Sequence, residues 1–239
     1  VHVDTPVDEV IQTIEKYNLV AVPVVDSIGR LVGRITVDDV MDEVREQAER
    51  DYQLASGLSQ DVETDDSVFR QTTARLPWLL IGMLGGIGNS MILGNFDTTF
   101  AAHPEMALYI PLIGGTGGNV GTQSSALVVQ GLANSSLDAN NTWKQILKES
   151  VVALINATII SMLVYIYNFV RFGATATVSY SVSLSLFAVV MFASIFGTLV
   201  PMTLEKLKID PAIATGPFIS ITNDIIGMML YMGITVLLS

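Results

Sequence analysis

A carboxylate, Asp224, lies near the middle of the last apolar segment of the sequence, residues 211–238. Gly216 and Ser220 precede it at spacings of four residues, so the three share one face if the segment is helical. A central Asp costs about 2.5–3.5 kcal/mol in a membrane helix. A cation offsets this cost, because unit charges about 4 Å apart interact by about 4 kcal/mol at an effective dielectric of about 20. The pattern favours a cation site, and a protonated, hydrogen-bonded or proton-relaying Asp224 is the alternative.

A second apolar segment, residues 107–132, contains the run PLIGGTGGNVGTQ over 111–123. Its Asn119, Thr122 and Gln123 offer neutral oxygens, and Mg²⁺ is usually held by one or two carboxylates with several of its waters retained. Because glycine is unfavourable in helices, the run predicts a broken or thinned helix whose freed carbonyls face protein or a water-filled cavity. Close helix packing is the other explanation, since the glycines also have GxxxG spacing.

The elements that position these residues follow from the distribution of charge. Residues 1–75 hold 16 acidic and 7 basic residues, a local net charge of −9, whereas the rest of the 239-residue chain has a net charge of −2. This predicts an acidic soluble part followed by a membrane part. The absence of cysteine excludes disulfides and thiolate metal sites within this sequence. Five apolar segments are long enough to cross about 30 Å of hydrocarbon, and they are residues 76–95, 107–132, 146–170, 181–204 and 211–238.

Basic residues flank these segments unevenly. One set of connections carries Arg70, Arg75, Lys144, Lys148, Lys206 and Lys208, whereas the opposite set carries only Arg171. By the positive-inside rule, the soluble part is expected in the cytoplasm and the C-terminus outside, in a multi-pass protein of the plasma (inner) membrane. The first residue is Val1 and the chain opens in the middle of a pattern, so we expect its natural N-terminus to lie upstream.

The soluble part has the order helix, strand, turn, strand, helix, and it resembles one CBS module. The resemblance rests on Val22–Asp26, Gly29 and Gly33–Asp39. We therefore expect residues 1–50 to form the second module of a CBS pair and residues 51–75 to be a connecting segment. The resemblance implies that Thr36 and Asp39 touch a nucleotide, with ATP as the candidate, and a simple helix cap is the alternative role of Thr36.

Acidic residues crowd the helix that follows. The candidate regulatory metal site consists of five of them: Asp39, Asp42, Glu43, Glu46 and Glu49. Several of these lie four residues apart, where like charges on a helix repel. Hard divalent cations bound at low affinity would relieve this repulsion. A solvated acidic face is the alternative explanation.

The whole chain resembles the MgtE family of magnesium channels and transporters. The residues that carry the resemblance are Pro111, Gly114–Ser124, Lys148-Glu149, Asp210-Pro211 and Asp224. It implies a membrane all-α fold with five transmembrane helices per subunit, preceded by a small α/β CBS module and a connecting helix. It also implies a homodimer in the lipid bilayer, with the pore on the two-fold axis and divalent cations, Mg²⁺ above all, as ligands.

The resemblance further implies roles for individual residues. The Mg²⁺ ligands in the pore would be Asp224, Gly118, Asn119, Ser220 and Gly216, with Glu149 at the cytoplasmic pore entrance. Mg²⁺ would enter down its electrochemical gradient, and cytosolic Mg²⁺ on the acidic region would shut the pore. A carrier or exchanger for Mg²⁺, Mn²⁺ or Co²⁺ with a titrating Asp224 is the alternative. We do not expect an enzyme, because His2 and His103 are isolated and no nucleophile–base or phosphate-loop pattern is present. Nucleic acid is not among the expected partners.

Overall fold

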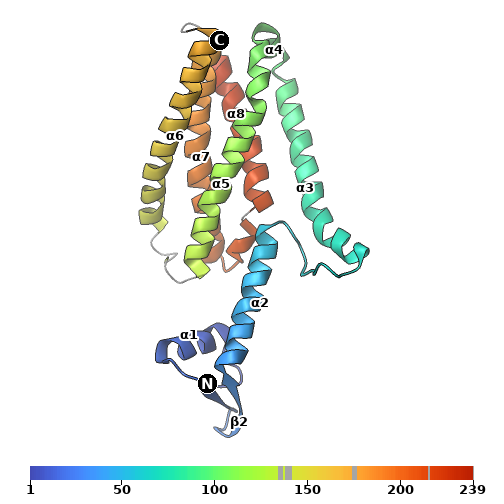
Figure 1. Cartoon of the computed structure of the whole chain (residues 1–239), viewed down its shortest axis with the longest axis vertical. Coiled ribbons are helices and arrows are strands. Elements are labelled where there is room, and N and C mark those ends of the chain that lie inside the picture. Colours follow the sequence, from blue (N-terminus) through green and yellow to red (C-terminus); the bar gives the residue numbers. More distant parts are fainter. Residues whose placement is uncertain (134–136, 138–141, 174–176, 215, 239) are drawn as a thin grey trace. The chain divides into compact units, whose positions relative to one another are not determined.

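The computed structural model describes residues 1–239 except 134–136, 138–141, 174–176, 215 and 239 (Figure 1). The chain divides into two compact units, Val1–Tyr52 and Gln53–Ser239. Each unit has its own arrangement of elements.

The first unit has a two-stranded antiparallel sheet next to two helices. Its elements are α1 (Val7–Tyr17), β1 (Ala21–Val25), β2 (Leu31–Thr36) and the greater part of α2 (Val37–Ala55), and Ala21 pairs with Thr36 in the sheet. The core is small and consists of Val10, Ile14, Val22 and Val40. The order of elements predicted for a CBS module is therefore confirmed.

The turn between the two strands is held by one carboxylate. Asp26 Oδ1 accepts hydrogen bonds from the backbone N–H groups of Ile28 at 3.0 Å and Arg30 at 2.9 Å. The Arg30 backbone N–H is the largest cause that lowers the pKa of Asp26 below its usual value. Gly29 adopts a φ of +82°, a conformation that favours glycine, so this turn requires glycine at that position.

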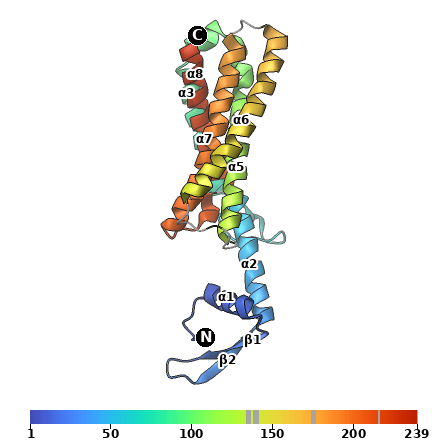
Figure 2. The ribbon, with the colours of Figure 1, turned by 90° about the vertical axis from the view of Figure 1, so that its left-hand side faces the viewer.

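The second unit is a bundle of long helices that run side by side (Figures 1 and 2). Helix α7 packs against α5, α6 and α8, and α8 also packs against α3 and α5. The helices are α3 (Val68–Gly94), α4 (Asp97–Ala102), η1 (Pro104–Tyr109), α5 (Ile110–Ala133), α6 (Thr142–Phe172), α7 (Thr177–Lys206), η3 (Pro211–Ala214) and α8 (Gly216–Leu238).

Four stretches of the described residues are long and apolar enough to cross a membrane. They are Val68–Gly94, Thr142–Phe172, Thr177–Lys206 and Pro211–Leu238. The prediction of five spans is therefore supported for four. The remaining helix, α5, has 24 residues, but its glycines and polar side chains dilute its apolar character. It nevertheless packs against α7 and α8 inside the bundle.

The bundle core lies where α5, α7 and α8 meet η1. Ile113, Leu186, Tyr231 and Met106 are fully buried there. The Tyr231 hydroxyl donates to the Met106 carbonyl at 2.8 Å, so this buried phenol is satisfied. Large apolar side chains on the outer faces of α3 and α6 are exposed, as expected for helices against lipid, and examples are Leu79, Leu84, Leu154 and Leu163.

Candidate ion-conducting site

Helix α5 is unbroken through its glycine run. It continues as an α-helix from Ile110 to Ala133, across all five glycines. The prediction of a broken or thinned helix with freed carbonyls is therefore wrong. The physical reason is tertiary: glycine's missing side chain is used to bring neighbouring helices close, which compensates for its low helix propensity.

Two of these glycines lie against Asp224. A Cβ added to Gly114 would lie 3.5 Å from Asp224 Oδ1, and one added to Gly118 would lie 3.4 Å from the same oxygen. The Cβ of Gly118 would also lie 2.8 Å from Ser220 Oγ. The structure thus brings Gly118, Ser220 and Asp224 together at the contact between α5 and α8, and their roles as ion ligands stay predictions.

Asp224 is partly exposed at this contact. The ion pairs formed among the described residues do not include it. A carboxylate in the middle of an apolar helix, next to a serine hydroxyl and two glycines, lacks the basic partner that usually accompanies such a group. The arrangement suits a ligand that brings positive charge.

The other two predicted pore residues are placed differently. Asn119 lies one residue past Gly118 on an exposed face of α5, and its carbonyl accepts a hydrogen bond from the Thr122 hydroxyl at 3.0 Å. Gly216 begins α8 with a φ of +43°, and a Cβ there would overlap the carbonyl oxygen of Ala55. Gly216 therefore has a packing reason to be glycine. The ion-binding roles of both residues stay predictions.

Glu149 of α6 is buried, at 8% exposure. Its Oε1 accepts hydrogen bonds from Ser124 Oγ of α5 at 2.6 Å and Ser194 Oγ of α7 at 2.5 Å. One carboxylate oxygen therefore links three helices. Sequence reasoning did not foresee that these serines bond Glu149, although each is a polar residue within an apolar stretch. The predicted metal role of Glu149 stays a prediction, and in the single chain its carboxylate already has two donors.

The acidic helix α2 contains its own counter-charges. Arg50 pairs with Glu46 at 2.7 Å and with Glu43 at 3.2 Å, and Arg45 pairs with Glu49 at 3.1 Å. These pairs relieve the repulsion that the sequence pattern predicted, without a metal. The other two predicted ligands, Asp39 and Asp42, form no ion pair within the described part of the chain.

Thr36 and Asp39 bond to each other at the start of α2. The Asp39 carboxylate accepts from the Thr36 hydroxyl at 2.6 Å and from the Thr36 backbone N–H at 2.8 Å. The hydroxyl is the largest cause that lowers the pKa of Asp39. This is the return bond of a capping box, in which the third helical residue caps the N-terminal one. The Thr36 hydroxyl donates in this arrangement, so its role as a helix cap and its role in nucleotide binding both stay predictions.

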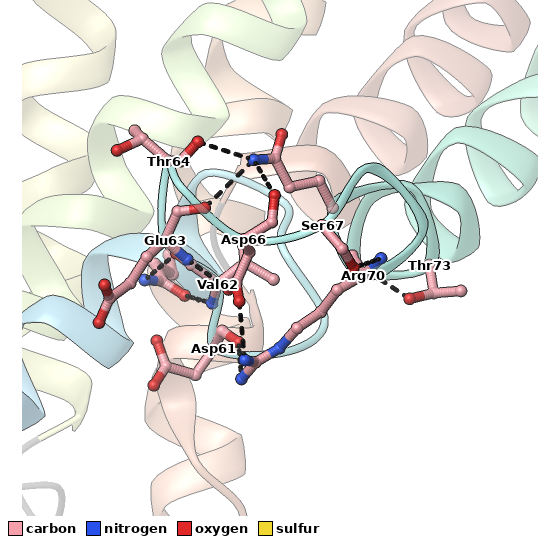
Figure 3. Close-up of polar contacts among 10 residues, drawn as sticks. Asp61, Val62, Glu63, Thr64, Asp66, Ser67, Arg70 and Thr73 are labelled. Carbon is pink, nitrogen blue, oxygen red and sulfur yellow. Dashed lines mark hydrogen bonds and ion pairs between the residues drawn. The ribbon is translucent and has the colours of Figure 1, made fainter.

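The segment before α3 is folded by hydrogen bonds (Figure 3). Asp66 Oδ1 pairs with Arg70 at 2.9 Å, and Asp66 Oδ2 accepts from the backbone N–H of Glu63 at 2.9 Å. The Arg70 guanidinium also reaches the Asp61 carbonyl at 3.1 Å. The described residues contain no group of three or more His, Asp or Glu side chains placed to hold a metal ion, here or elsewhere.

A bundle of apolar helices with an unpaired carboxylate at an internal helix contact is typical of a membrane protein that moves cations. The profile of the MgtE family, described as a divalent cation transporter, matches residues 110–234, and the CBS domain profile matches residues 1–46. The chain therefore belongs to the MgtE family of membrane proteins and carries a CBS domain. This is a family of transporters rather than enzymes.

Three curated relatives, each named magnesium transporter MgtE, are similar over most of the chain. The protein of Bacillus subtilis (strain 168) is 34% identical over 95% of this chain and 50% of its own length. That of Thermus thermophilus is 33% identical over 100% and 53%, and that of Enterococcus faecalis is 31% identical over 98% and 51%. The chain thus spans about half the length of the curated relatives it matches.

Proposed function

We propose that this chain forms the ion pathway of a Mg²⁺ transport protein in which Asp224 is the central ligand. The observation that carries the proposal is the position of the Asp224 carboxylate, which lies against Gly114 and Gly118 of α5 and has no basic partner among the described residues. The choice of Mg²⁺ as the ion rests on the three relatives, each of which is named a magnesium transporter.

The ion chemistry fits a sparse set of oxygens. Mg²⁺ gives up its waters reluctantly and is commonly held through one or two carboxylates, with several waters retained. In a homodimer with its pore on the two-fold axis, Asp224 of each subunit supplies one carboxylate. Neutral groups of the pore residues Gly118, Asn119, Ser220 and Gly216 then face the hydrated ion, and Glu149 lies toward the cytoplasmic end.

Mg²⁺ moves into the cell, down its electrochemical gradient. The bundle lies in the plasma (inner) membrane and the N-terminal unit lies on its cytoplasmic side. The six basic residues on one side of the bundle, against Arg171 on the other, support this orientation. An inside-negative potential is worth about 2.3 kcal/mol per elementary charge per 100 mV, so it favours entry of a divalent cation.

Closure follows when cytosolic Mg²⁺ binds the acidic helix α2. This helix has seven acidic and two basic residues, so its arginine pairs leave a large negative charge. Two such units in a dimer repel each other until cations bridge them, with Asp39, Asp42, Glu43, Glu46 and Glu49 as the ligands. ATP at Thr36 and Asp39 is a further ligand of the same unit.

A carrier or exchanger is the second candidate, and it requires Asp224 to bind and release a proton during transport. The two candidates differ in one observable. Recording from single molecules in a planar bilayer gives unitary currents for a channel and none for a carrier.

The proposal is tested with Asp224→Asn, which removes the charge at nearly constant volume. In liposomes, Mg²⁺ flux should fall by about a hundredfold or more, because about 3 kcal/mol of lost ion stabilisation corresponds to that factor in a rate. The matched control is Glu205→Gln at the exposed end of α7, which removes one carboxylate charge away from the site. Wild-type flux in Asp224→Asn would overturn the proposal.

A further inference from the structure

The side-chain amide of Asn223, the residue before Asp224, is buried and forms no hydrogen bond with the described residues. It is 1% exposed, and neither its amide oxygen nor its amide nitrogen has a hydrogen-bond partner in the part of the chain that the structure describes. Leaving such a buried group unpaired destabilises the folded state. An apolar residue would fill the same space without this cost, so packing by itself does not account for an amide here.

The amide end of Asn223 occupies the space that a side chain on Gly121 would take. A Cβ added to Gly121 would overlap the Asn223 Nδ2 atom and would lie 2.8 Å from Ile219 Cγ2. On its other side, the backbone of Gly121 lies close to α7, because a Cβ added to Gly197 of α7 would overlap the Gly121 carbonyl. Helix α5 therefore has no room to retreat from Asn223.

Helix α5 thus contacts two successive residues of α8 through different glycines. Gly114 and Gly118 lie against Asp224, whereas Gly121 lies against Asn223. Successive residues of an α-helix with 3.6 residues per turn are separated by about 100° around its axis. Fixing the angular position of Asn223 therefore fixes the direction of Asp224.

We propose that Asn223 is a positioning residue: its amide, seated against Gly121, sets the rotation of α8 and so directs the Asp224 carboxylate toward Gly114 and Gly118. The consequence for selectivity rests on the proposed function, whereas the packing relation does not. Asn223 acts through Asp224 and is not itself an ion ligand.

The rotation of α8 can be measured without ion flux. The Cβ position of Gly118 lies 3.7 Å from Ser220 Cβ, within the range of disulfides. The sequence contains no cysteine, so Gly118→Cys combined with Ser220→Cys gives a single reporter pair. In membranes treated with a mild oxidant, we expect this pair to cross-link readily. Gly115→Cys with Ser220→Cys is the negative control, because the Gly115 Cβ has no neighbour within 4 Å.

The decisive variant is Gly121→Ala in the reporter background. The added methyl should displace Asn223, turn α8 and slow cross-linking by about tenfold, equivalent to about 1.4 kcal/mol. Adding Asn223→Ala should restore the rate to within about threefold of that of Asn223→Ala alone, because additivity fails for residues in contact. Gly115→Ala should leave it unchanged. An unchanged rate in Gly121→Ala, or no recovery in the double variant, would overturn the proposal.

Flux measurements on the same variants without the cysteines test the consequence for the ion. Asn223→Ala should lower the ratio of Mg²⁺ to Ca²⁺ flux by about threefold or more, since about 0.7 kcal/mol of lost discrimination corresponds to that factor. If Gly121→Ala does not yield folded protein, Asn223→Ala tests the proposal in its place. An unchanged ratio of Mg²⁺ to Ca²⁺ flux in Asn223→Ala would then overturn the proposal. If the wild-type chain carries no Mg²⁺, the proposed function fails while the cross-linking result stands.

Discussion

Acidic residues serve different ends in helix α2 and at the contact between α5 and α8. Helix α2 carries seven acids on a largely exposed surface, and Arg45 and Arg50 neutralise three of them locally. The α5–α8 contact carries one carboxylate, Asp224, with glycines in place of a basic partner. Exposed ion pairs are worth about 0–1 kcal/mol each. A carboxylate inside a membrane bundle costs several times more to leave uncompensated.

The difference shows that the number of acids is a poor guide to where a cation is needed. In α2, arginine side chains neutralise part of the negative charge, so a bound cation neutralises only what remains. At Asp224 no compensation comes from the described residues, so the requirement for a cation is greater. The predictions below break or sharpen this contrast, beginning with the largest expected effect.

Glu149 tests whether a buried carboxylate always implies an ion. Glu149→Ala removes the acceptor shared by Ser124 and Ser194 and leaves the two buried hydroxyls only each other at 3.0 Å, so we expect a loss of about 1–3 kcal/mol in the free energy of unfolding. Unfolding in mixed detergent micelles measures it, with Glu205→Ala as the control. Normal stability together with lost Mg²⁺ flux would instead favour the predicted metal role.

Arg50 tests the partial self-compensation of α2. Arg50→Ala releases Glu43 and Glu46 from their ion pair, so cytosolic Mg²⁺ should bind this helix more tightly and close the pore at a concentration about two- to fivefold lower, in keeping with exposed pairs worth under about 1 kcal/mol. Titration of Mg²⁺ flux against cytosolic Mg²⁺ measures it. Arg30→Ala is the control, because Arg30 pairs with Asp26 in the strand turn.

A higher or unchanged closing concentration in Arg50→Ala would contradict the role of α2 in gating. It would leave the assignment of Asp224 untouched, since the two regions are tested by separate variants.

The smallest effect is expected at the start of α2. Thr36→Ala removes the hydroxyl that bonds Asp39 and should lower the melting temperature of the first unit by a few degrees, as other lost caps do. The pKa of Asp39 is lowered in the folded state, so its contribution is present at neutral pH and is lost as pH falls through the acid range. The difference between wild type and Thr36→Ala should therefore shrink on acidification.

Thermal melts at neutral and acid pH measure that difference. Thr13→Ala is the control, since its hydroxyl bonds a backbone carbonyl within α1 and involves no carboxylate. A difference that grows in acid would show that the Thr36–Asp39 bond does not supply the stability.

The family, the order of elements in the CBS domain and the contact of Gly118 and Ser220 with Asp224 were predictable from sequence. These features are recorded in local patterns: strand and helix periods, the glycine run and a carboxylate within an apolar segment. The sequence also predicted a span over residues 107–132, and α5 forms there, but α5 is not among the four stretches apolar enough to cross a membrane, because its glycines and polar residues lower its hydropathy. The same property that makes α5 useful thus hides it from a hydropathy criterion.

The sequence alone determined that an acidic soluble part precedes an apolar one and that Asp224 needs compensation. Only the tertiary structure decided that α5 stays helical, that Gly121 accommodates Asn223 and that Glu149 is held by serines from two other helices. The physical reason is that these outcomes depend on which helix faces meet. Glycine spacing is compatible with a broken helix and with close packing, and the choice is made by side chains distant in the sequence.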